Sequence, residues 1–552
     1  MLRKLRRKMR SLMVRLFLFT VILLCFFPPL FLVAEWGLDL FSPYPVHLIE
    51  GRKASMCIKA RDGSVLRVVP TASGERAFRV SLDTVNRHVV NALIAGEDKR
   101  FRHHTGVDFT AVVRAALTNL VQGRVVSGAS TLTMQVVRLV EPRPRTCISK
   151  GIEVFRARQL ERVLSKDRIL EAYLNLAPFG GVLRGIEAAA LYWFGKHAVD
   201  LAPEEAATLV AMLPAPTARS PHRSPIWLVY HRNRVLDRML KEEMISPETH
   251  ARAVAAPLGA KKHPWPFLAP HLCDRIVIAR EDRRPMVHTS LDLDLQQQVE
   301  VVVRGHDDAG VDGVAVVVLD RDTGAVRAMV GSRDYRRHPL NAACCRRAPG
   351  STLKPFLYGL AMEVGILGPD SLVLDTRVEF GDFRPMNFSE DFSGPMRAAD
   401  ALAESRNIPA VRLLRSVGVD RFRDLLHRVG LATSGQIHLD AALGTMSISP
   451  LELAQAYVAL CGETSDSGLG KGTRNQLLRM LGRHSPAPDV VPSASMAWKT
   501  GTSSGRRDAW SVGVTAEVVV VVWLGNLDGG GAPDLVGGRS AAKLLAGVVS
   551  VL

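Results

Sequence analysis

The chain has 552 residues, of which 47% are hydrophobic and 23% are charged, a composition that indicates two or three folded domains and excludes a largely disordered chain. Lys and Arg total 71 against 54 acidic residues, and the net charge of +17 favours anionic partners such as nucleic acid, lipid headgroups or phosphorylated substrates. The sequence contains no Cys-x-x-Cys pair, zinc-finger spacing or glycine-rich phosphate loop, which argues against a nucleic-acid partner.

The first 35 residues have the pattern of a cytoplasmic tail and a membrane anchor. MLRKLRRKMR has six basic residues and no acidic one, and an apolar run follows over 16–34. At about 1.5 Å per residue this run nearly spans a hydrocarbon core of about 30 Å. Because basic flanks stay in the cytoplasm, we predict a single-pass inner-membrane protein with residues 36 onward in the periplasm. The alternative is a cleaved signal peptide, but its apolar run is usually about 7–15 residues, and VAEWG is a poor cleavage site.

The cysteines do not predict a disulfide framework. There are seven, an odd number, Cys25 lies in the apolar run, and Cys344 and Cys345 are adjacent. Pairing among the other cysteines stays open, and no function follows for Cys344 and Cys345.

A juxtamembrane segment over 36–75 precedes a region of helical periodicity. TAVVRAALTNLVQG and PEEAATLVAMLP both repeat apolar residues at spacings of 3 and 4, and alternating β-branched residues are scarce. We predict a mainly α domain over 76–255.

Three polar stretches in this domain carry candidate chemistry. EDKRFRHHTGVD begins with Glu97 and Asp98, which alone would be interpreted as a charged surface turn. GASTLTMQ is a hydroxyl-rich loop that can cap a helix and bind an anion. SKGIEVFRARQLE places Lys150 and Glu153 near one helical face. Carboxylates among cations and hydroxyls are suited to glycosyl transfer from a phosphate leaving group, although the spacing alone does not prove it.

These stretches resemble motifs of the peptidoglycan glycosyltransferases of family 51. EDKRFRHHTG is similar to Glu-Asp-x-x-Phe-x-x-His-x-Gly, GASTLTMQ to Gly-x-Ser-Thr-x-Thr-x-Gln, and SKGIE to Arg-Lys-x-x-Glu; SKDRILEAYLN and EEAATLVAMLPAP resemble two further helices. The resemblance implies a lysozyme-like domain in which Glu97 is the general base for the acceptor 4-hydroxyl and Glu153 acts on the pyrophosphate side. It implies substrate-binding roles for Asp98, Phe101, His104, Thr131, Gln135, Arg138 and Lys150.

Two residues depart from the family motifs. Ser149 stands where the motif has Arg, and Met134 stands where it has the first Gln of a Gln-Gln pair. We expect these departures to weaken phosphate binding or to shift acceptor preference.

A Pro-rich, basic stretch over 256–290 predicts a linker, and the pattern then changes. GVAVVVLDRDTGAVRAMVG and AWSVGVTAEVVVVVWLG each predict a β-hairpin, whereas GPMRAADALAES and SPLELAQAYVAL predict helices. We therefore predict an α/β domain with an antiparallel sheet over 291–552.

GSTLKPF places Ser351 three residues before Lys354, on one helical face. Ser351 alone could be a helix cap, but it could also be a nucleophile whose proton Lys354 removes. ESRNIPA then supplies Ser405 and Asn407, and WKTGTSSG supplies a Lys-Thr-Gly triplet at Lys499. Ser-x-x-Lys, Ser-x-Asn and Lys-Thr-Gly in this order resemble the signature of penicillin-binding proteins and serine β-lactamases.

The resemblance implies roles for each of these residues. Ser351 attacks the D-Ala-D-Ala carbonyl with Lys354 as base, and Ser405 and Lys499 relay the proton to the departing D-Ala. The backbone amides of Ser351 and Thr502 form the oxyanion hole. Since Gly501 has no side chain, substrate can lie along the strand edge. The implied substrate-binding residues are Asn407, Thr500, Gly501 and Thr502.

Both halves together resemble the bifunctional class A penicillin-binding proteins, closest to their 1C type. Members of that type usually have a further C-terminal β-domain, which we expect to be absent because the chain stops at SAAKLLAGVVSVL. The segment between LCGET and MAWKTG is short compared with the family, so we expect the rim of the acyl site to differ from that of the family. The implied function is polymerisation of lipid II and cross-linking of stem peptides. The alternatives are that only one domain is active, or that the protein is a non-catalytic penicillin-binding receptor or scaffold.

The implied partners are lipid II, nascent glycan strands, stem peptides, the membrane and β-lactam inhibitors, with other cell-wall synthesis proteins as candidates and no nucleic acid. Transpeptidation needs no cofactor. A divalent metal such as magnesium is consistent with glycosyl transfer by family analogy, but no dedicated ligand cluster is visible in the sequence.

Overall fold

The structure is a computed structural model that describes residues 33, 36–37, 39–122, 128–279, 284–306, 310–432, 436–462, 467–482 and 496–552. These residues form two compact units: unit 1 contains Val68–Trp265 and the described residues before Cys57, and unit 2 contains Cys57–Arg67 and Pro266–Leu552. The predicted anchor over 16–34 lies outside the described residues except for Val33. Within the described ranges, no helix is long and apolar enough to cross a membrane.

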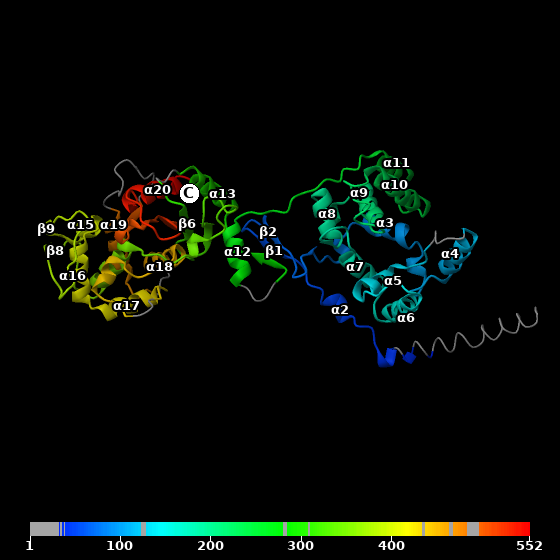
Figure 1. Cartoon of the computed structure of the whole chain (residues 1–552), viewed down its shortest axis with the longest axis horizontal. Coiled ribbons are helices and arrows are strands. Elements are labelled where there is room, and N and C mark those ends of the chain that lie inside the picture. The colour runs from blue at the N-terminus through cyan, green and yellow to red at the C-terminus, as the bar shows by residue number, and fades with distance from the viewer. Residues whose placement is uncertain are drawn as a thin grey trace, which may run out of the picture. The chain divides into compact units, whose positions relative to one another are not determined.

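Unit 1 is helical, which confirms the prediction of a mainly α domain (Figure 1). A pair of two-residue strands, β3 (Arg76–Ala77) and β4 (Leu183–Arg184), accompanies the helices. The helices are α2 (His47–Glu50), α3 (Arg87–Glu97), α4 (Phe109–Gln122), α5 (Leu132–Val140), α6 (Cys147–Val163), α7 (Lys166–Leu176), α8 (Ile186–Phe194), α9 (Pro203–Met212), α10 (Pro225–Lys241) and α11 (Pro247–Ala255).

Local sequence signals set the ends of several of these helices. The Thr131 hydroxyl accepts a hydrogen bond from the amide of Met134 and so caps α5, and Ser165 caps α7 in the same way. Apolar residues at helical spacing then face one core, where Leu93 of α3, Val136 of α5 and Leu170 of α7 are fully buried. This core fixes the C-terminus of α3 beside α5, which is where two predicted functional motifs meet.

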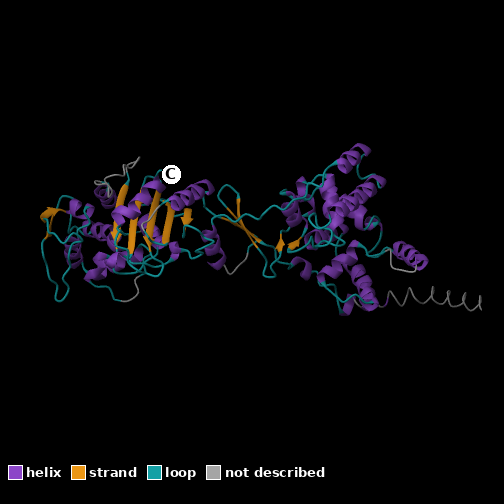
Figure 2. Cartoon of the chain, turned by 45° about the horizontal axis from the view of Figure 1, so that its top comes forward, coloured by secondary structure: helices purple, strands orange, loops and turns teal. Residues whose placement is uncertain are grey.

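Unit 2 is built on a five-stranded antiparallel sheet in the order β10-β11-β12-β6-β7, drawn in orange in Figure 2. Its strands are β6 (Gly313–Asp320), β7 (Val326–Val330), β10 (Ala497–Thr502), β11 (Asp508–Val514) and β12 (Val518–Gly525). Both predicted hairpins, β6–β7 and β11–β12, are therefore confirmed. Among the described strands β10 lies at the edge of the sheet, so one side of it has no neighbour within that part of the chain.

Helices cover the sheet on both faces. α13 (Leu293–Gly305) and α20 (Ala542–Val549) pack on one face through a core that includes Val299, Val316 and Leu545. α18 (Pro450–Cys461) packs against β6 and β12 and confirms the helix predicted from SPLELAQAYVAL. Burial on both faces explains why β6 and β12 are continuous apolar runs and do not alternate.

Unit 2 contains further helices besides those on the two faces of the sheet. They are α12 (Pro270–Ala279), α14 (Lys354–Glu363), α15 (Ala398–Ala403), α16 (Asn407–Val417), α17 (Val419–Arg428) and α19 (Lys471–Leu481). The short strands are β1 (Met56–Lys59), β2 (Val65–Val69), β5 (Met286–His288), β8 (Leu372–Asp375) and β9 (Gly394–Arg397).

The structure differs from the sequence expectation at two places. The first four residues of GPMRAADALAES form β9, paired with β8, and the helix begins only at Ala398, because Pro395 is unsuited to a helix interior and β8 offers a strand partner. The stretch over 256–290 contains α12 and β5, and β5 pairs in parallel with Cys57–Lys59 of β1. Cys57–Arg67, which lies between two parts of unit 1 in the sequence, thus belongs to unit 2.

Candidate functional site

Glu97 is the last residue of α3 and is held by α5. The Gln135 side-chain amide donates a hydrogen bond to Glu97 Oε2 at 2.9 Å, and the Tyr173 hydroxyl donates to Gln135 Oε1 at 3.0 Å. Tyr173 is buried on α7, so it fixes which end of the Gln135 amide faces the carboxylate. The predicted base therefore has an oriented donor on one of its oxygens.

Burial raises the pKa of Glu97, and the hydrogen bond from Gln135 and the charges of Arg238 and Arg219 oppose this rise. Arg238 donates to the backbone oxygen of Gly96 at 2.7 Å, directly before the carboxylate. A raised pKa suits a group that must take a proton near neutral pH. Sequence reasoning missed both arginines, because neither belongs to a recognisable spacing.

Asp98, Phe101 and His104 fasten the turn that follows Glu97. Asp98 accepts a hydrogen bond from the Leu132 amide at 3.0 Å, and His104 Nε2 lies 3.1 and 3.2 Å from its two carboxylate oxygens. Phe101 is fully buried and its ring contacts His104 edge-on. These contacts hold the turn in place beside Glu97, and the substrate-binding roles that the family resemblance implies for the three residues stay predictions.

The second predicted carboxylate, Glu153, lies buried on α6. Lys150 Nζ donates to Glu153 Oε2 at 3.0 Å and to the Ser130 hydroxyl at 2.7 Å. The GASTLTMQ stretch thus connects to both carboxylates. Gln135 contacts Glu97 directly, and Ser130 is linked to Glu153 through Lys150. This arrangement places a cation beside the carboxylate on the predicted phosphate side.

The remaining residues of unit 1 that the sequence singled out differ in their burial and contacts. Thr131 donates to the Gly106 backbone oxygen at 2.6 Å while capping α5. Arg138 is half-buried, and its charge opposes the rise that burial causes in the pKa of Tyr173. Met134 lies in the hydrophobic core, so its side chain replaces a polar one at a packing position. Ser149 is buried at the start of α6, and its hydroxyl accepts from Thr146 at 3.0 Å.

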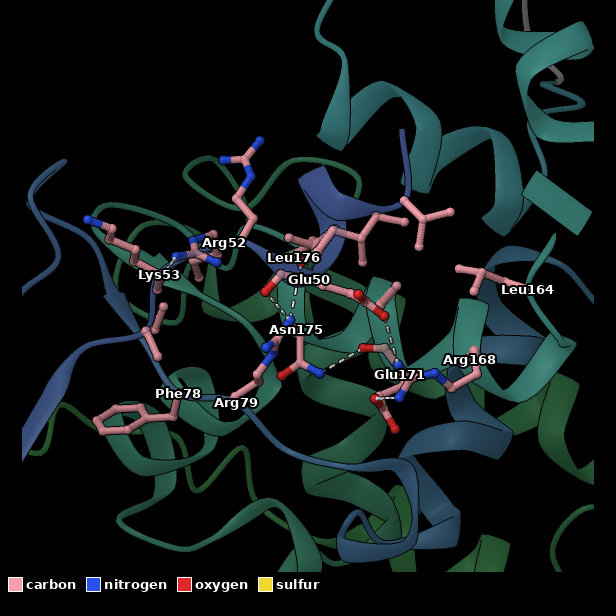
Figure 3. Close-up of a pocket in the computed structure, with 16 residues that line it drawn as sticks. Glu50, Arg52, Lys53, Phe78, Arg79, Leu164, Arg168, Glu171, Asn175 and Leu176 are labelled. Atoms are coloured by element: carbon pink, nitrogen blue, oxygen red, sulfur yellow. Dashed lines mark hydrogen bonds and ion pairs between the residues drawn. The ribbon is translucent and has the colours of Figure 1, made fainter. Parts of the chain in front are cut away.

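A small cavity of unit 1 lies apart from these residues, between α2, β3 and α7 (Figure 3). Its volume of about 40 Å³ is too small for a sugar and holds no more than a few water molecules. Arg168 at its edge is paired with Glu171 at 2.7 Å, and Arg79 donates to the Glu50 backbone oxygen at 2.8 Å. These two arginines are already paired, and the cavity is too small for a sugar, so it is not a substrate site.

In unit 2, Ser351 lies in a 3₁₀ turn, Gly350–Leu353, that runs directly into α14. It lines a cavity of about 570 Å³, which is large enough for a peptide end. No hydrogen bond holds the Ser351 hydroxyl within the described part of the chain. The cavity brings together six of the residues predicted from sequence: Ser351, Ser405, Asn407, Thr500, Gly501 and Thr502.

Two buried lysines converge on Ser405 beneath this cavity. Lys354 Nζ donates to the Ser405 backbone oxygen at 2.5 Å and to Asn407 Oδ1 at 2.7 Å. Lys499 Nζ donates to the Ser405 hydroxyl at 2.8 Å and to the Thr500 backbone oxygen at 2.8 Å. One serine therefore connects both lysines that the sequence motifs single out.

Burial lowers the pKa of Lys354 well below its usual value, and the charge of Lys499 lowers it further. Burial also lowers the pKa of Lys499 to about 7. Asp375 acts in the opposite direction on Lys354. Asp375 is fully buried, accepts from Asn387 at 2.8 Å and was not found from the sequence, because it is a single acid with no motif around it.

β10 and the nucleophile turn approach each other closely. A Cβ on Gly501 would lie 2.4 Å from the Pro349 backbone oxygen, and one on Gly350 would lie 3.0 Å from the Thr502 amide nitrogen. Gly501 is therefore required for packing of β10 against this turn, a different reason from the substrate clearance that we expected. The same approach brings together the chain segments that carry the Ser351 and Thr502 amides.

The residues that the structure describes contain no group of three or more His, Cys, Asp or Glu side chains arranged to hold a metal ion. Glu153, on the side of unit 1 where a magnesium ion is implied, is already paired with Lys150. These residues do not form a preorganised metal site, and no step below depends on one. Cys57, Cys273, Cys344, Cys345 and Cys461 are free thiols.

Comparison with known proteins matches both units to families. The Transglycosylase family model matches residues 62–240, and that of the Penicillin binding protein transpeptidase domain matches 314–464. The chain is 36% identical to penicillin-binding protein 1C of Escherichia coli (strain K12), over 95% of this chain and 71% of that protein. It is 31% identical to penicillin-binding protein 1F of Bacillus subtilis (strain 168), over 81% of this chain and 70% of that protein.

A solved structure supports the fold. The crystal structure of penicillin-binding protein 1A from Haemophilus influenzae superposes with a TM-score of 0.56 at 18% identity, covering 90% of this chain and 92% of that chain. Both family domains are thus present in one chain, with the arrangement of a glycan-polymerising unit followed by a peptide-cross-linking unit. The chain belongs to the class A penicillin-binding proteins and is a bifunctional peptidoglycan synthase.

Proposed function

We propose that this synthase polymerises lipid II with Glu97 as general base and cross-links stem peptides through an acyl-enzyme on Ser351. The observation that carries the proposal is the convergence of Lys354 and Lys499 on Ser405, next to a serine hydroxyl that opens into the cavity. A non-catalytic receptor would not need two lysines whose pKa values burial lowers toward neutrality.

In the glycosyl transfer, Glu97 accepts the proton of the acceptor 4-hydroxyl as that oxygen attacks the donor sugar. The bond to the pyrophosphate breaks with inversion at the sugar carbon, and Lys150 stabilises the charge that develops on the leaving group. Gln135 keeps Glu97 oriented through the hydrogen bond of 2.9 Å. This step requires Glu97 in its deprotonated form.

In the acyl transfer, the Ser351 hydroxyl attacks the D-Ala-D-Ala carbonyl and its proton passes to Lys354. A neutral Lys354 has two N–H groups, which are committed to the Ser405 carbonyl and to Asn407, so its lone pair is left for the Ser351 proton. Ser405 and Lys499 then deliver a proton to the nitrogen of the departing D-Ala. An amine of a second stem peptide attacks the acyl-enzyme and releases Ser351.

We place the protein at the periplasmic side of the inner membrane, with the basic N-terminus in the cytoplasm. The exposed face of α4 supports this placement, because it presents Phe109, Val113, Leu117 and Val121 to solvent at helical spacing. Apolar residues of this kind suit contact with the acyl region from which a lipid-linked substrate is taken. Lipid II, nascent glycan strands, stem peptides and β-lactams are the proposed ligands.

Two single variants of the purified full chain test the residue roles. In Glu97→Gln, lipid II polymerisation is expected to fall by at least about 100-fold while labelling with a fluorescent penicillin persists. In Ser351→Ala, labelling is expected to vanish while polymerisation persists. Polymerisation at the wild-type rate in Glu97→Gln, or stable labelling of Ser351→Ala, would contradict the assignment.

A further inference from the structure

The helix α10 of unit 1 exposes a stripe of aromatic and basic side chains that none of the catalytic motifs includes. Trp227, His231, Arg234 and Arg238 follow one another at spacings of 4, 3 and 4, so they lie on one face of the helix, and Tyr230 borders them. The opposite face is buried and packs on α3 and α9, as their neighbouring positions in Figure 1 show. The stripe is therefore not needed for the core.

The aromatic end of the stripe is an ordered cluster. Trp227 is 64% exposed, and its ring lies 6.0 Å from that of Tyr230, edge-on, and 6.3 Å from that of His231, nearly parallel. Arg234 lies over the Tyr230 ring at 5.7 Å. These contacts limit the rotamers of Trp227 while its indole ring stays exposed to solvent. A flat ligand could therefore stack on this ring without a large loss of side-chain entropy.

The other end of the stripe reaches the glycosyl-transfer site. Arg238 binds the Gly96 backbone oxygen at 2.7 Å, one residue before the predicted base. Arg219 provides a second connection, because its charge acts on both Glu97 and His231. From Arg238 to Trp227 is eleven residues of helix, or about 16 Å. A glycan strand with one end at Glu97 would thus reach Trp227 only with a sugar several units away from that end.

The chemistry of the stripe favours a saccharide over an acyl chain. The C–H face of a pyranose ring packs on an indole or phenol ring, while its hydroxyl and acetamido groups need donors and acceptors such as those of His231 and Tyr230. The arginines complement the carboxylates of the peptides that peptidoglycan sugars carry. The exposed face of α4 differs from this stripe in composition, because its exposed residues are apolar and are not paired with basic side chains. That face suits an acyl chain better than a saccharide.

We propose that Trp227, Tyr230 and His231 form a saccharide-binding subsite that holds the glycan strand several sugars away from the bond formed at Glu97. Arg234 supports the subsite by fixing Tyr230 and by attracting peptide carboxylates. This proposal rests on the proposed glycosyl transfer and adds to it a site that retains the strand between successive additions. Loss of the subsite should therefore shorten the glycan chains and leave the first coupling step intact.

The test compares Trp227→Ala with Trp227→Phe and with the matched control Ile226→Ala in the purified full chain. Ile226 is 84% exposed in the same helical turn and lies beside Tyr230 at the edge of the stripe, but no aromatic contact involves it. Its truncation therefore removes a similar exposed apolar surface and leaves the Trp227–Tyr230–His231 cluster in place. Two measurements are made: the affinity for chitotetraose, a lipid-free β-1,4-linked amino-sugar tetramer, and the chain length and initial coupling rate obtained from lipid II. Thermal unfolding and penicillin labelling check that each variant is folded.

We expect Trp227→Ala to weaken chitotetraose binding by about 5- to 10-fold, the effect of losing one aromatic contact of about 1 kcal/mol, and to shorten the chains with an unchanged initial rate. Trp227→Phe should retain most of the affinity, and Ile226→Ala should match the wild type. Equal affinity and chain length in Trp227→Ala and wild type would overturn the proposal.

A lipid-facing role would give a different pattern. Trp227→Ala and Ile226→Ala would then lower binding to anionic phospholipid vesicles by similar factors, with no change in chitotetraose affinity, and this outcome would also overturn the subsite. Failure of the wild-type chain to make any polymer would instead overturn the proposed glycosyl transfer, so the two failures are distinguishable.

Discussion

At the scale of single residues, Ser405 is the point where the acyl-transfer site is assembled. Its hydroxyl binds Lys499 and its carbonyl binds Lys354, and its backbone has a φ of 62°, a left-handed value that is uncommon for serine. Such a conformation costs about 1 kcal/mol or more and persists because surrounding contacts impose it. The turn lets one residue present two different oxygens to two buried amines.

Gln135→Ala should shift the pH dependence of polymerisation. The Gln135 hydrogen bond lowers the pKa of Glu97, which burial raises, so its removal raises that pKa further. Because the base must be deprotonated, we expect the acidic limb of the polymerisation profile to move to higher pH. Penicillin labelling of the same variant across pH is the control and should not change. A downward shift or no shift would contradict the role of Gln135.

Lys499→Met should alter how stability depends on pH. The pKa of Lys499 is about 7 in the folded chain against 10.5 for an ordinary lysine, so between these values the unfolded chain binds a proton that the folded chain does not. The free energy of unfolding of the wild type should therefore rise with pH across this window relative to Lys499→Met, by roughly 2–5 kcal/mol in total. Urea unfolding at pH 7, 9 and 10 measures this difference. If the free energies of unfolding of the wild type and Lys499→Met instead changed with pH in parallel, the lowered pKa of Lys499 would be contradicted.

At the scale of elements, the acyl site depends on how closely β10 approaches the 3₁₀ turn before α14. Gly501 permits that approach, since a Cβ there would collide with the Pro349 backbone oxygen. The edge position of β10 leaves its other side free of a strand partner, so substrate backbone can pair there. The packing of one glycine thus sets the distance between the nucleophile and the strand that holds the substrate.

Gly501→Ala should separate these two elements. Because the added methyl group meets backbone and cannot be accommodated by a side-chain rotation, we expect a loss of about 1–3 kcal/mol in stability and at least about a 10-fold slower rate of penicillin acylation. Gly472→Ala in α19 is the matched control, because no atom lies within 4 Å of a Cβ at that position. Stopped-flow acylation and thermal unfolding measure both effects. Equal acylation rates in the two variants would refute the packing argument.

Several elements and site residues are predictable from sequence, and others are not. The β6–β7 and β11–β12 hairpins follow from paired apolar runs around short polar turns. The Ser-x-x-Lys, Ser-x-Asn and Lys-Thr-Gly motifs identify residues that line one cavity and the two lysines that contact Ser405 beneath it. Arg238 could not be found, because only the packing of α10 on α3 brings it to Gly96. Asp375 is likewise a lone acid that tertiary structure places near Lys354.

At the scale of the whole molecule, two activities are carried by two units with separate hydrophobic cores. The core of unit 1 includes residues of α3 and of α5 to α10, and that of unit 2 is formed by the five-stranded sheet with α13 and α20. The chain does not divide in simple order, since Cys57–Arg67 belongs to unit 2 although residues of unit 1 lie on both sides of it in the sequence. Local strand signals in β1 do not reveal a partner as distant as β5.

Separate cores predict that damage to one site leaves the other active. The most direct measurement of this central claim is the product that the purified full chain makes from lipid II. After muramidase digestion, the wild type should yield both glycan-derived disaccharide units and peptide-cross-linked dimers, and addition of a penicillin should remove only the dimers. A wild-type chain that produces neither polymer nor cross-links would contradict the account.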